Sequence, residues 1–111
     1  APSRPLSFHE LGTLTFEKPD PHRFPCLEMA YQAGREGGSE PCVLNAANEV
    51  AVALHLKGRI NCGAIPKILR EVMDRHAPEP APDIARLREW DRWGREQAQE
   101  ASQAYLVDAK A

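Results

Sequence analysis

The sequence lacks the features that would place it in a membrane or direct it to secretion. None of its apolar runs approaches the ~20 residues that cross a bilayer. Its first residues, APSRPL, do not contain the apolar core of a signal peptide. We therefore expect a cytoplasmic protein without a membrane partner. Because the chain begins at Ala1 and not at a methionine, we also expect it to be a piece of a longer protein.

An excess of charge of one sign is also missing. Fourteen Lys and Arg residues stand against 16 Asp and Glu residues, which gives a net charge of −2. No basic cluster forms a phosphate-binding face, so nucleic acid is not an expected partner. The three cysteines, Cys26, Cys42 and Cys62, are an odd number without the close spacing of metal ligands. They are typical of reduced thiols in a reducing compartment.

Recognisable catalytic motifs are absent as well. The chain has no glycine-rich dinucleotide fingerprint, no phosphate loop and no acidic metal pair. Its four histidines lie on separate predicted elements, which favours surface or packing roles over a metal site: His9, His22, His55 and His76. Cys26 and Cys62 occupy apolar positions, so core packing is favoured over nucleophilic catalysis. We therefore assign no catalytic, cofactor-binding or metal-binding residue to this chain.

What the sequence does contain is a buried helical pattern around which the rest is organised. We expect this central helix to begin at Asn45, as the N-cap with Glu49 near the positive end, and to finish at Lys57 and Gly58. Its main apolar stripe is Ala47, Val50, Ala51 and Leu54. Further apolar residues widen this surface, so the helix should contact several neighbours: Ala46, Ala53 and Leu56.

Three further helices are predicted around the central one. The first runs from Pro25 to about Arg35, and Gly37 or Gly38 is its left-handed stop. Its predicted inner face is Leu27, Ala30, Tyr31 and Gly34. After a loop that should bury Ile60 and Cys62, the next runs from about Gly63 to His76. It has the clearest amphipathic pattern in the chain: Ile65, Ile68, Leu69, Val72 and Met73.

The proline-rich run 77–82 is expected to be a stiff linker before the last helix. A short helical turn at Ile84 and Leu87 should precede a helix that is capped by Asp91. This helix carries Trp93, Gly94, Ala98, Ala101 and Tyr105. The predicted fold is therefore all-α, a four-helix, bundle-like domain over residues 25–111.

Residues 1–24 hold four of the ten prolines and are expected to form an extended linker. The run Thr13–Glu17 contains L-T-F and resembles a short strand. An isolated strand leaves its own backbone groups unpaired, so this run needs another segment to pair with. The rest of the sequence does not identify that segment.

Two groups of residues could contact a ligand. Asn45, Asn48 and Glu49 place two amides and a carboxylate at the predicted start of the central helix, although capping and pinning of loops is the favoured role. Trp90 and Trp93 could stack on a base or a sugar, but their spacing places them on nearly one helix face, which favours core packing. Without a site, the chain could be a free-standing helical module that binds another protein.

Four ordered motifs decide between these possibilities: L-T-F-E-K-P-D, R-F-P-C-L, L-N-A-A-N-E-V-A-V and D-R-W-G-R-E-Q-A. From about Leu6 to Ala98, the chain resembles the C-terminal part of the 1-deoxy-D-xylulose 5-phosphate reductoisomerase family. It departs from the family at Gly94, where alanine is usual and glycine weakens a helix by up to ~1 kcal/mol. Gly63 replaces a usual capping residue, and Cys62 replaces a larger apolar one.

The resemblance implies a longer parent enzyme and assigns this chain a supporting part of it. The implied parent has an NADPH-binding domain, a catalytic middle domain with metal and dimer contacts, and a C-terminal helical domain. With NADPH and a magnesium or manganese ion it converts the keto-phosphate to 2-C-methyl-D-erythritol 4-phosphate in isoprenoid biosynthesis. The family's ligand and metal contacts lie upstream of Ala1, so the resemblance carries none of them onto this chain. The implied partners are these upstream domains and a second enzyme subunit.

Overall fold

The structure, a computed structural model, describes residues 25–107, and these residues form an all-α domain. Its helices are α2 (Pro25–Glu36), α3 (Glu40–Leu56), α4 (Ala64–Arg75) and α5 (Ile84–Ser102), followed by the 3-10 helix η1 (Gln103–Tyr105). The prediction of four helices is confirmed. The linker and strand predicted in residues 1–24 lie outside the described residues. None of the described helices is long and apolar enough to cross a membrane.

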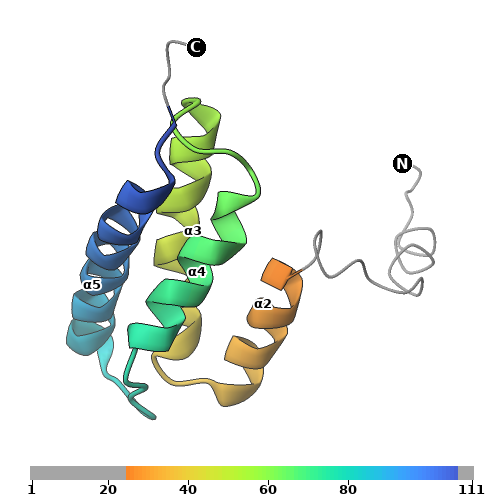
Figure 1. Cartoon of the computed structure of the whole chain (residues 1–111). Helices are drawn as coiled ribbons and strands as arrows, with labels where there is room; N and C mark the ends of the chain where they lie inside the picture. The colour runs from red at the N-terminus through yellow and green to blue at the C-terminus, as the bar shows by residue number, and fades with distance from the viewer. Residues whose placement is uncertain (1–24, 108–111) are drawn as a thin grey trace, which may run out of the picture.

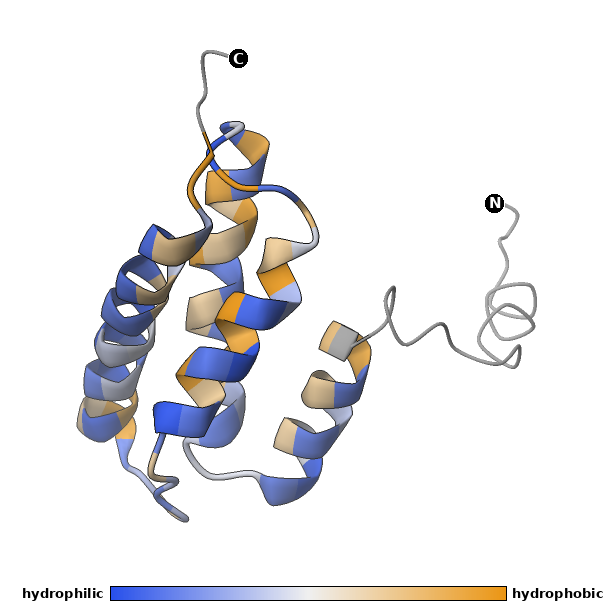
Figure 2. Ribbon diagram, in the orientation of Figure 1, coloured by the Kyte–Doolittle hydropathy of each residue, from blue (hydrophilic) through white to orange (hydrophobic). Residues whose placement is uncertain are grey.

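Helix α3 is the central element, as predicted, because it contacts each of the other three helices. Figure 1 shows α3 between α4 and α5, with α2 at the side of the group. In Figure 2 the visible surface of α5 is mostly hydrophilic, whereas hydrophobic residues concentrate on α3 and α4. The largest fully buried apolar side chains come from α3, α4 and the loop between them: Val43, Ile60, Ile68, Leu69 and Val72.

The start of α3 differs from the prediction. The helix begins at Glu40 after the N-cap Ser39, so Asn45 is an exposed interior residue and does not cap it. Pro41 lies in the first turn, where its missing N–H has no intrahelical partner to lose. The placement of Glu49 near the positive end is therefore also wrong, because Glu49 lies in the middle of the helix. Its predicted end is confirmed, since Gly58 (φ +74°) closes a Schellman motif in which Arg59 N–H donates to Leu54 O.

The start of α5 also differs. One continuous helix replaces the predicted short turn and separate last helix, and its N-cap is Asp83 in place of Asp91. The Asp83 carboxylate accepts the backbone N–H of Arg86 at 2.8 Å. Tyr105, predicted in this helix, lies in η1 instead. Helix α4 agrees with its prediction, and Gly63 provides no side-chain cap for it.

Several predicted burials are wrong. Helix α2 turns Met29 and Ala33 into the core, whereas Leu27 and Tyr31 remain 42% and 62% exposed. The residues of the predicted face and the observed face are both apolar, so the period of the pattern alone does not choose between them. Other residues predicted to be buried but found exposed are Ala53, Leu56 and Cys62. They lie on the outer side of α3 or in the loop that follows it.

The end of the described chain is attached to the loop after α3. Ile60 and Leu106 form an isolated antiparallel bridge, and Val107 N–H donates to Arg59 O at 2.8 Å. Ile60 is buried in the core, as predicted. This pairing joins two segments that are far apart in the sequence.

Gly94 of α5 lies close to the backbone and side chains of α3. A Cβ atom there would lie 3.1 Å from Val43 O and 3.2 Å from the Ala46 Cβ. We expect Gly94→Ala to lower the free energy of unfolding by about 1 kcal/mol, because overpacking of 1–3 kcal/mol exceeds the gain in helix propensity of up to ~1 kcal/mol. Chemical denaturation measures this change.

Gly34→Ala is the matched control, because a Cβ on Gly34 in α2 meets no atom within 4 Å. We expect it to raise the free energy of unfolding by ~0.5 to 1 kcal/mol through helix propensity alone. Stabilisation of similar size by both substitutions would contradict a tight α3–α5 contact at Gly94.

Candidate functional site

The predicted polar cluster at the central helix is divided between two surfaces. Asn45 and Asn48 line a groove between α2 and α3. Glu49 instead points to α5, where its carboxylate accepts from Arg95 Nη2 at 2.7 Å. Asp91 also accepts from Arg95, so this guanidinium joins α3 to α5 at the surface, and both hydrogen bonds raise the pKa of Arg95. The three residues therefore do not form one site.

The α2–α3 groove is mainly apolar and has a volume of about 310 Å³. Its lining combines small and apolar side chains of both helices with Leu69 from α4, and none of the lining residues is charged. Asn45 is exposed and Asn48 is half-buried, and each amide side chain carries both donors and an acceptor at the groove. The groove can accept an uncharged group, but it holds no acid, base or nucleophile apart from the Cys26 thiol, whose pKa is raised by burial.

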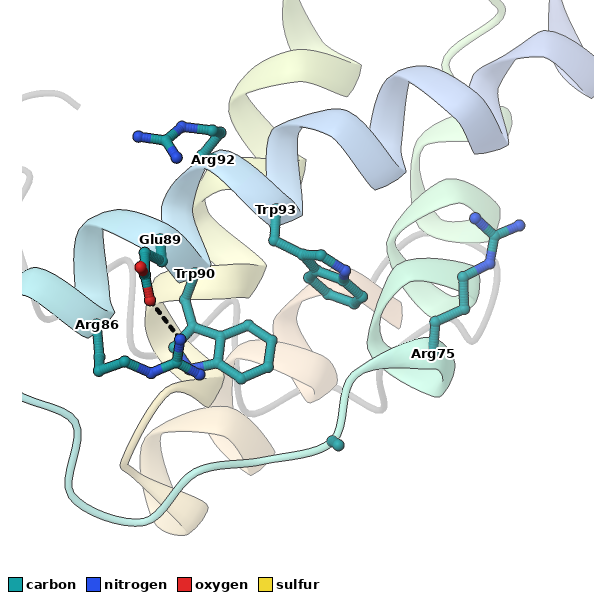
Figure 3. Close-up of a pocket in the computed structure, with 7 residues that line it drawn as sticks. Arg75, Arg86, Glu89, Trp90, Arg92 and Trp93 are labelled. Atoms are coloured by element: carbon teal, nitrogen blue, oxygen red, sulfur yellow. Dashed lines mark hydrogen bonds and ion pairs between the residues drawn. The ribbon is translucent and has the colours of Figure 1, made fainter.

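A second hollow, of about 520 Å³, lies beside the two tryptophans. Figure 3 shows Trp90 and Trp93 extending from α5 on one side, with Arg75 across the hollow and Arg92 directed away from the indole rings. The indoles make an edge contact with centroids 5.4 Å apart, and both are half-buried against the core, as predicted.

The arginines of this hollow are already engaged by neighbouring side chains. Arg86 pairs with Glu79 and Glu89, while Arg75 donates to Gln97 and Glu100. With its guanidinium groups paired or directed away, the hollow does not present the converging donors that an anion site needs. We therefore regard it as a surface depression of the helix packing.

A group of hydrogen-bonded residues that no sequence pattern indicated joins two loops at one end of the molecule. We call it the loop junction: Gly38, Ser39, His76 and Glu79. Ser39 N–H donates to Glu79 O at 2.9 Å, and Glu79 N–H donates to Ser39 Oγ at 2.8 Å. Ser39 Oγ and His76 Nε2 are also hydrogen-bonded, at 2.8 Å. These bonds attach the α2–α3 connection to the proline-rich α4–α5 connection.

The loop junction does not have the organisation of a catalytic pair. Ser39 is fully buried and its oxygen already accepts the Glu79 N–H, so no substrate carbonyl can reach it. His76 Nδ1 is buried without a partner among the described residues, which leaves the imidazole without the orienting third group of a triad. The His76 ring packs against Trp90 at a centroid distance of 4.7 Å. Its role is therefore to hold the two loops together.

Burial makes His76 a source of acid sensitivity. Desolvation lowers the pKa of His76 in the folded protein, while the imidazole of the unfolded chain titrates near ~6.5. The unfolded state therefore binds more protons below that pH, and we expect the free energy of unfolding to fall as the pH decreases from 7.5 to 5.5. Urea denaturation of the wild-type chain and of His76→Gln at both pH values measures this dependence. An equal decrease in the two proteins would contradict it.

Metal binding finds no support within residues 25–107, where no three His, Cys, Asp or Glu side chains are grouped for it. His55 Nδ1 bonds to Ile60 O at 3.1 Å, and His9 and His22 lie outside the described residues. The three thiols are separate. Cys42 Sγ donates to Leu87 O at 3.3 Å, and Cys62 is exposed and not packed in the core as predicted.

The fold and these contacts define a helical domain whose buried polar groups serve its own packing. The profile of the DXP reductoisomerase C-terminal domain matches residues 1–97. The chain therefore belongs to the family of DXP reductoisomerase C-terminal domains, as the four sequence motifs indicated.

Full-length relatives support the same assignment. The chain is 50% identical over 95 residues to the 1-deoxy-D-xylulose 5-phosphate reductoisomerase of Moorella thermoacetica, covering 86% of this chain and 25% of the relative. It is 49% identical over 104 residues to that of a Synechococcus strain, covering 93% and 26%. The enzyme of Halothermothrix orenii is 44% identical over 97 residues, covering 87% and 25%. The chain thus spans about a quarter of the length of these relatives.

Proposed function

We propose that this chain is the helical C-terminal domain of an NADPH-dependent reductoisomerase that acts in isoprenoid biosynthesis. In this proposal the whole enzyme converts 1-deoxy-D-xylulose 5-phosphate to 2-C-methyl-D-erythritol 4-phosphate with NADPH and a magnesium or manganese ion. The observation that carries the proposal is the family match over residues 1–97, together with 44–50% identity to enzymes of that name.

Within that enzyme we assign the domain a supporting role. Its main polar contacts are internal, between Ser39, His76 and Glu79 at the loop junction and between Glu49 and Arg95 across α3 and α5. Such contacts hold a rigid scaffold and leave reacting groups to other domains. The proposed partners are the upstream NADPH-binding and catalytic domains and, through them, a second subunit. The free thiols at Cys26, Cys42 and Cys62 are consistent with a cytoplasmic location.

We expect the isolated 111-residue chain to bind neither NADPH nor Mg²⁺ and to turn over no substrate, because the ligand contacts belong to the upstream domains. Titration calorimetry with NADPH, Mg²⁺ and 1-deoxy-D-xylulose 5-phosphate tests this expectation. A heat signal with a micromolar dissociation constant would show that the domain has a ligand site of its own and would contradict the supporting role.

The gene sequence upstream of Ala1 separates this function from a free-standing interaction module. A dinucleotide-binding fingerprint in the same reading frame would support the enzyme. A start codon directly before Ala1 would support the module, whose binding surface would then be the exposed apolar side of α2.

A further inference from the structure

Helix α2 has more apolar surface than its contacts with α3 and α4 use. At 100° per residue, its apolar and small residues occupy an arc of about 200°, twice the stripe that one packed face requires. In rotational order these residues are Met29, Ala33, Cys26, Ala30, Gly34, Leu27 and Tyr31. Only Met29 and Ala33 are buried, and the remainder of the arc borders the α2–α3 groove or continues beyond it.

The groove offers two kinds of contact at once. Ala33, Leu44 and Leu69 provide an apolar wall, and Gly34 leaves open space because a Cβ there would meet no atom within 4 Å. Asn45 and Asn48 are one turn apart on α3, and both line the groove. An amide side chain supplies both a donor and an acceptor, which is what the backbone of an extended peptide needs.

The run Thr13–Glu17 has the complementary chemistry. Leu14 and Phe16 are two residues apart, so an extended chain presents both on the same side. The residues T-L-T-F carry no charge and lie between Glu10 and Glu17, which suits a groove without charged lining. The rest of the sequence identifies no pairing partner for the backbone of this run.

The connection between the run and the groove is long enough for the chain to fold back. Residues 17–24 separate Phe16 from the first residue of α2, and eight extended residues span up to ~28 Å. The groove follows α2 from Cys26 to Gly34, a rise of ~12 Å. The run therefore reaches any part of the groove without disturbing α2.

We propose that the run Thr13–Glu17 of this chain occupies the α2–α3 groove as an extended segment. Leu14 and Phe16 pack between α2 and α3, and the Asn45 and Asn48 amides bond to the backbone of the run. This arrangement covers the groove side of the α2 arc and gives the two asparagines a role in holding the N-terminal segment. The inference uses only residues of this chain and does not depend on the proposed enzymatic function.

Hydrogen exchange of the 111-residue chain, followed by mass spectrometry, tests the proposal. We expect the amides of residues 13–17 to exchange at least tenfold more slowly than in the variant Leu14→Ser with Phe16→Ser. The matched control is Leu6→Ser with Phe8→Ser, which removes the same residue types from the same segment and should leave protection unchanged. Free-peptide exchange rates at residues 13–17 in the wild-type chain would overturn the proposal.

Pulsed alkylation of the thiols gives a second readout from the groove itself. Cys26 lines the groove and Cys62 is exposed elsewhere, so Cys62 is the internal reference. We expect alkylation of Cys26 to become at least fivefold faster in the Leu14→Ser, Phe16→Ser variant, with no change at Cys62. Equal Cys26 rates in the two proteins would overturn the proposal.

Substitutions in the groove distinguish this site from others. Gly34→Leu fills the open space and Asn45→Ala with Asn48→Ala removes the amides, and both changes favour a helix, so the domain should remain folded. Each should return exchange at residues 13–17 to within twofold of the free-peptide rate. Protection that persists in both variants, or that depends on protein concentration, would overturn the proposal by placing the run elsewhere or on a second copy.

Discussion

Replacement of Gly38 by alanine should lower the free energy of unfolding by about 3 kcal/mol, because two penalties act at one position. Gly38 has φ +60°, a conformation that costs a residue with a Cβ about 1–2 kcal/mol. The Cβ would also lie 2.3 Å from Glu79 O and 3.1 Å from the Pro80 Cα, which are backbone atoms of the facing loop. Backbone cannot rotate away as a side chain does, so the loop junction must open or shift.

Gly37→Ala separates the two penalties. Gly37 has φ +68°, close to that of Gly38, but a Cβ there meets no atom within 4 Å. We expect this substitution to cost about 1 kcal/mol, which is the conformational part alone. Guanidinium denaturation of both variants gives the comparison. Equal losses would show that the close approach to Glu79 does not contribute to stability.

Removal of the Ser39 hydroxyl should have a similarly large effect. Ser39→Ala leaves the Glu79 N–H without its acceptor and His76 Nε2 without its partner, and both are held inside the loop junction. Each unpaired buried group costs about 1–3 kcal/mol, so we expect a loss of about 3 kcal/mol in the free energy of unfolding. The tryptophan fluorescence of Trp90 and Trp93, which pack on His76, follows the same transition in urea.

Ser102→Ala is the control for a buried serine. Ser102 is 1% exposed, but its hydroxyl only donates to Gln99 O within the same helical turn. Its removal leaves no buried donor without an acceptor, so we expect the free energy of unfolding to fall by about 1 kcal/mol or less. If Ser39→Ala costs no more than Ser102→Ala, the bonds between the two loops are not a significant source of stability.

The sequence predicted most of the helices because their local signals were consistent. Gly58 marked the end of α3, and apolar spacing marked α4 with Pro66 tolerated in its first turn. The start of α3 differs from the prediction because Pro41 fits a connection between helices as well as the first helical positions, where it lies. Asp83 and Asp91 are both possible N-caps for the last helix. Because the prediction placed the N-cap at Asp91, it divided one continuous helix into a short turn and a separate helix.

The orientation of α2 and the loop junction were beyond local signals. Helix α2 has apolar residues on most of its circumference, and only its neighbours determine that Met29 and Ala33 face the core. Ser39 and His76 are 37 residues apart in the sequence, and no periodic pattern relates them. Their hydrogen bond therefore depends on how α4 packs beside α3. The two glycines before Ser39 were a usable signal, because a left-handed Gly38 can indicate a close backbone approach as well as a helix stop.

The bridge between Ile60 and Leu106 has a consequence for how the domain opens. Because Arg59 and Val107 are also paired, α4 and α5 lie within a backbone loop that is closed at both ends. Helix α2 lies outside that loop and is attached through its own side-chain packing and the Gly38 turn. Helix α3 packs more extensively on α5 and α4 than on α2, so helices α3 to α5 form one cooperative unit. Helix α2 can detach from this unit at a lower free energy than global unfolding requires. Partial opening of this kind exposes the α2-facing side of the central helix, while α4 and α5 keep covering its other sides.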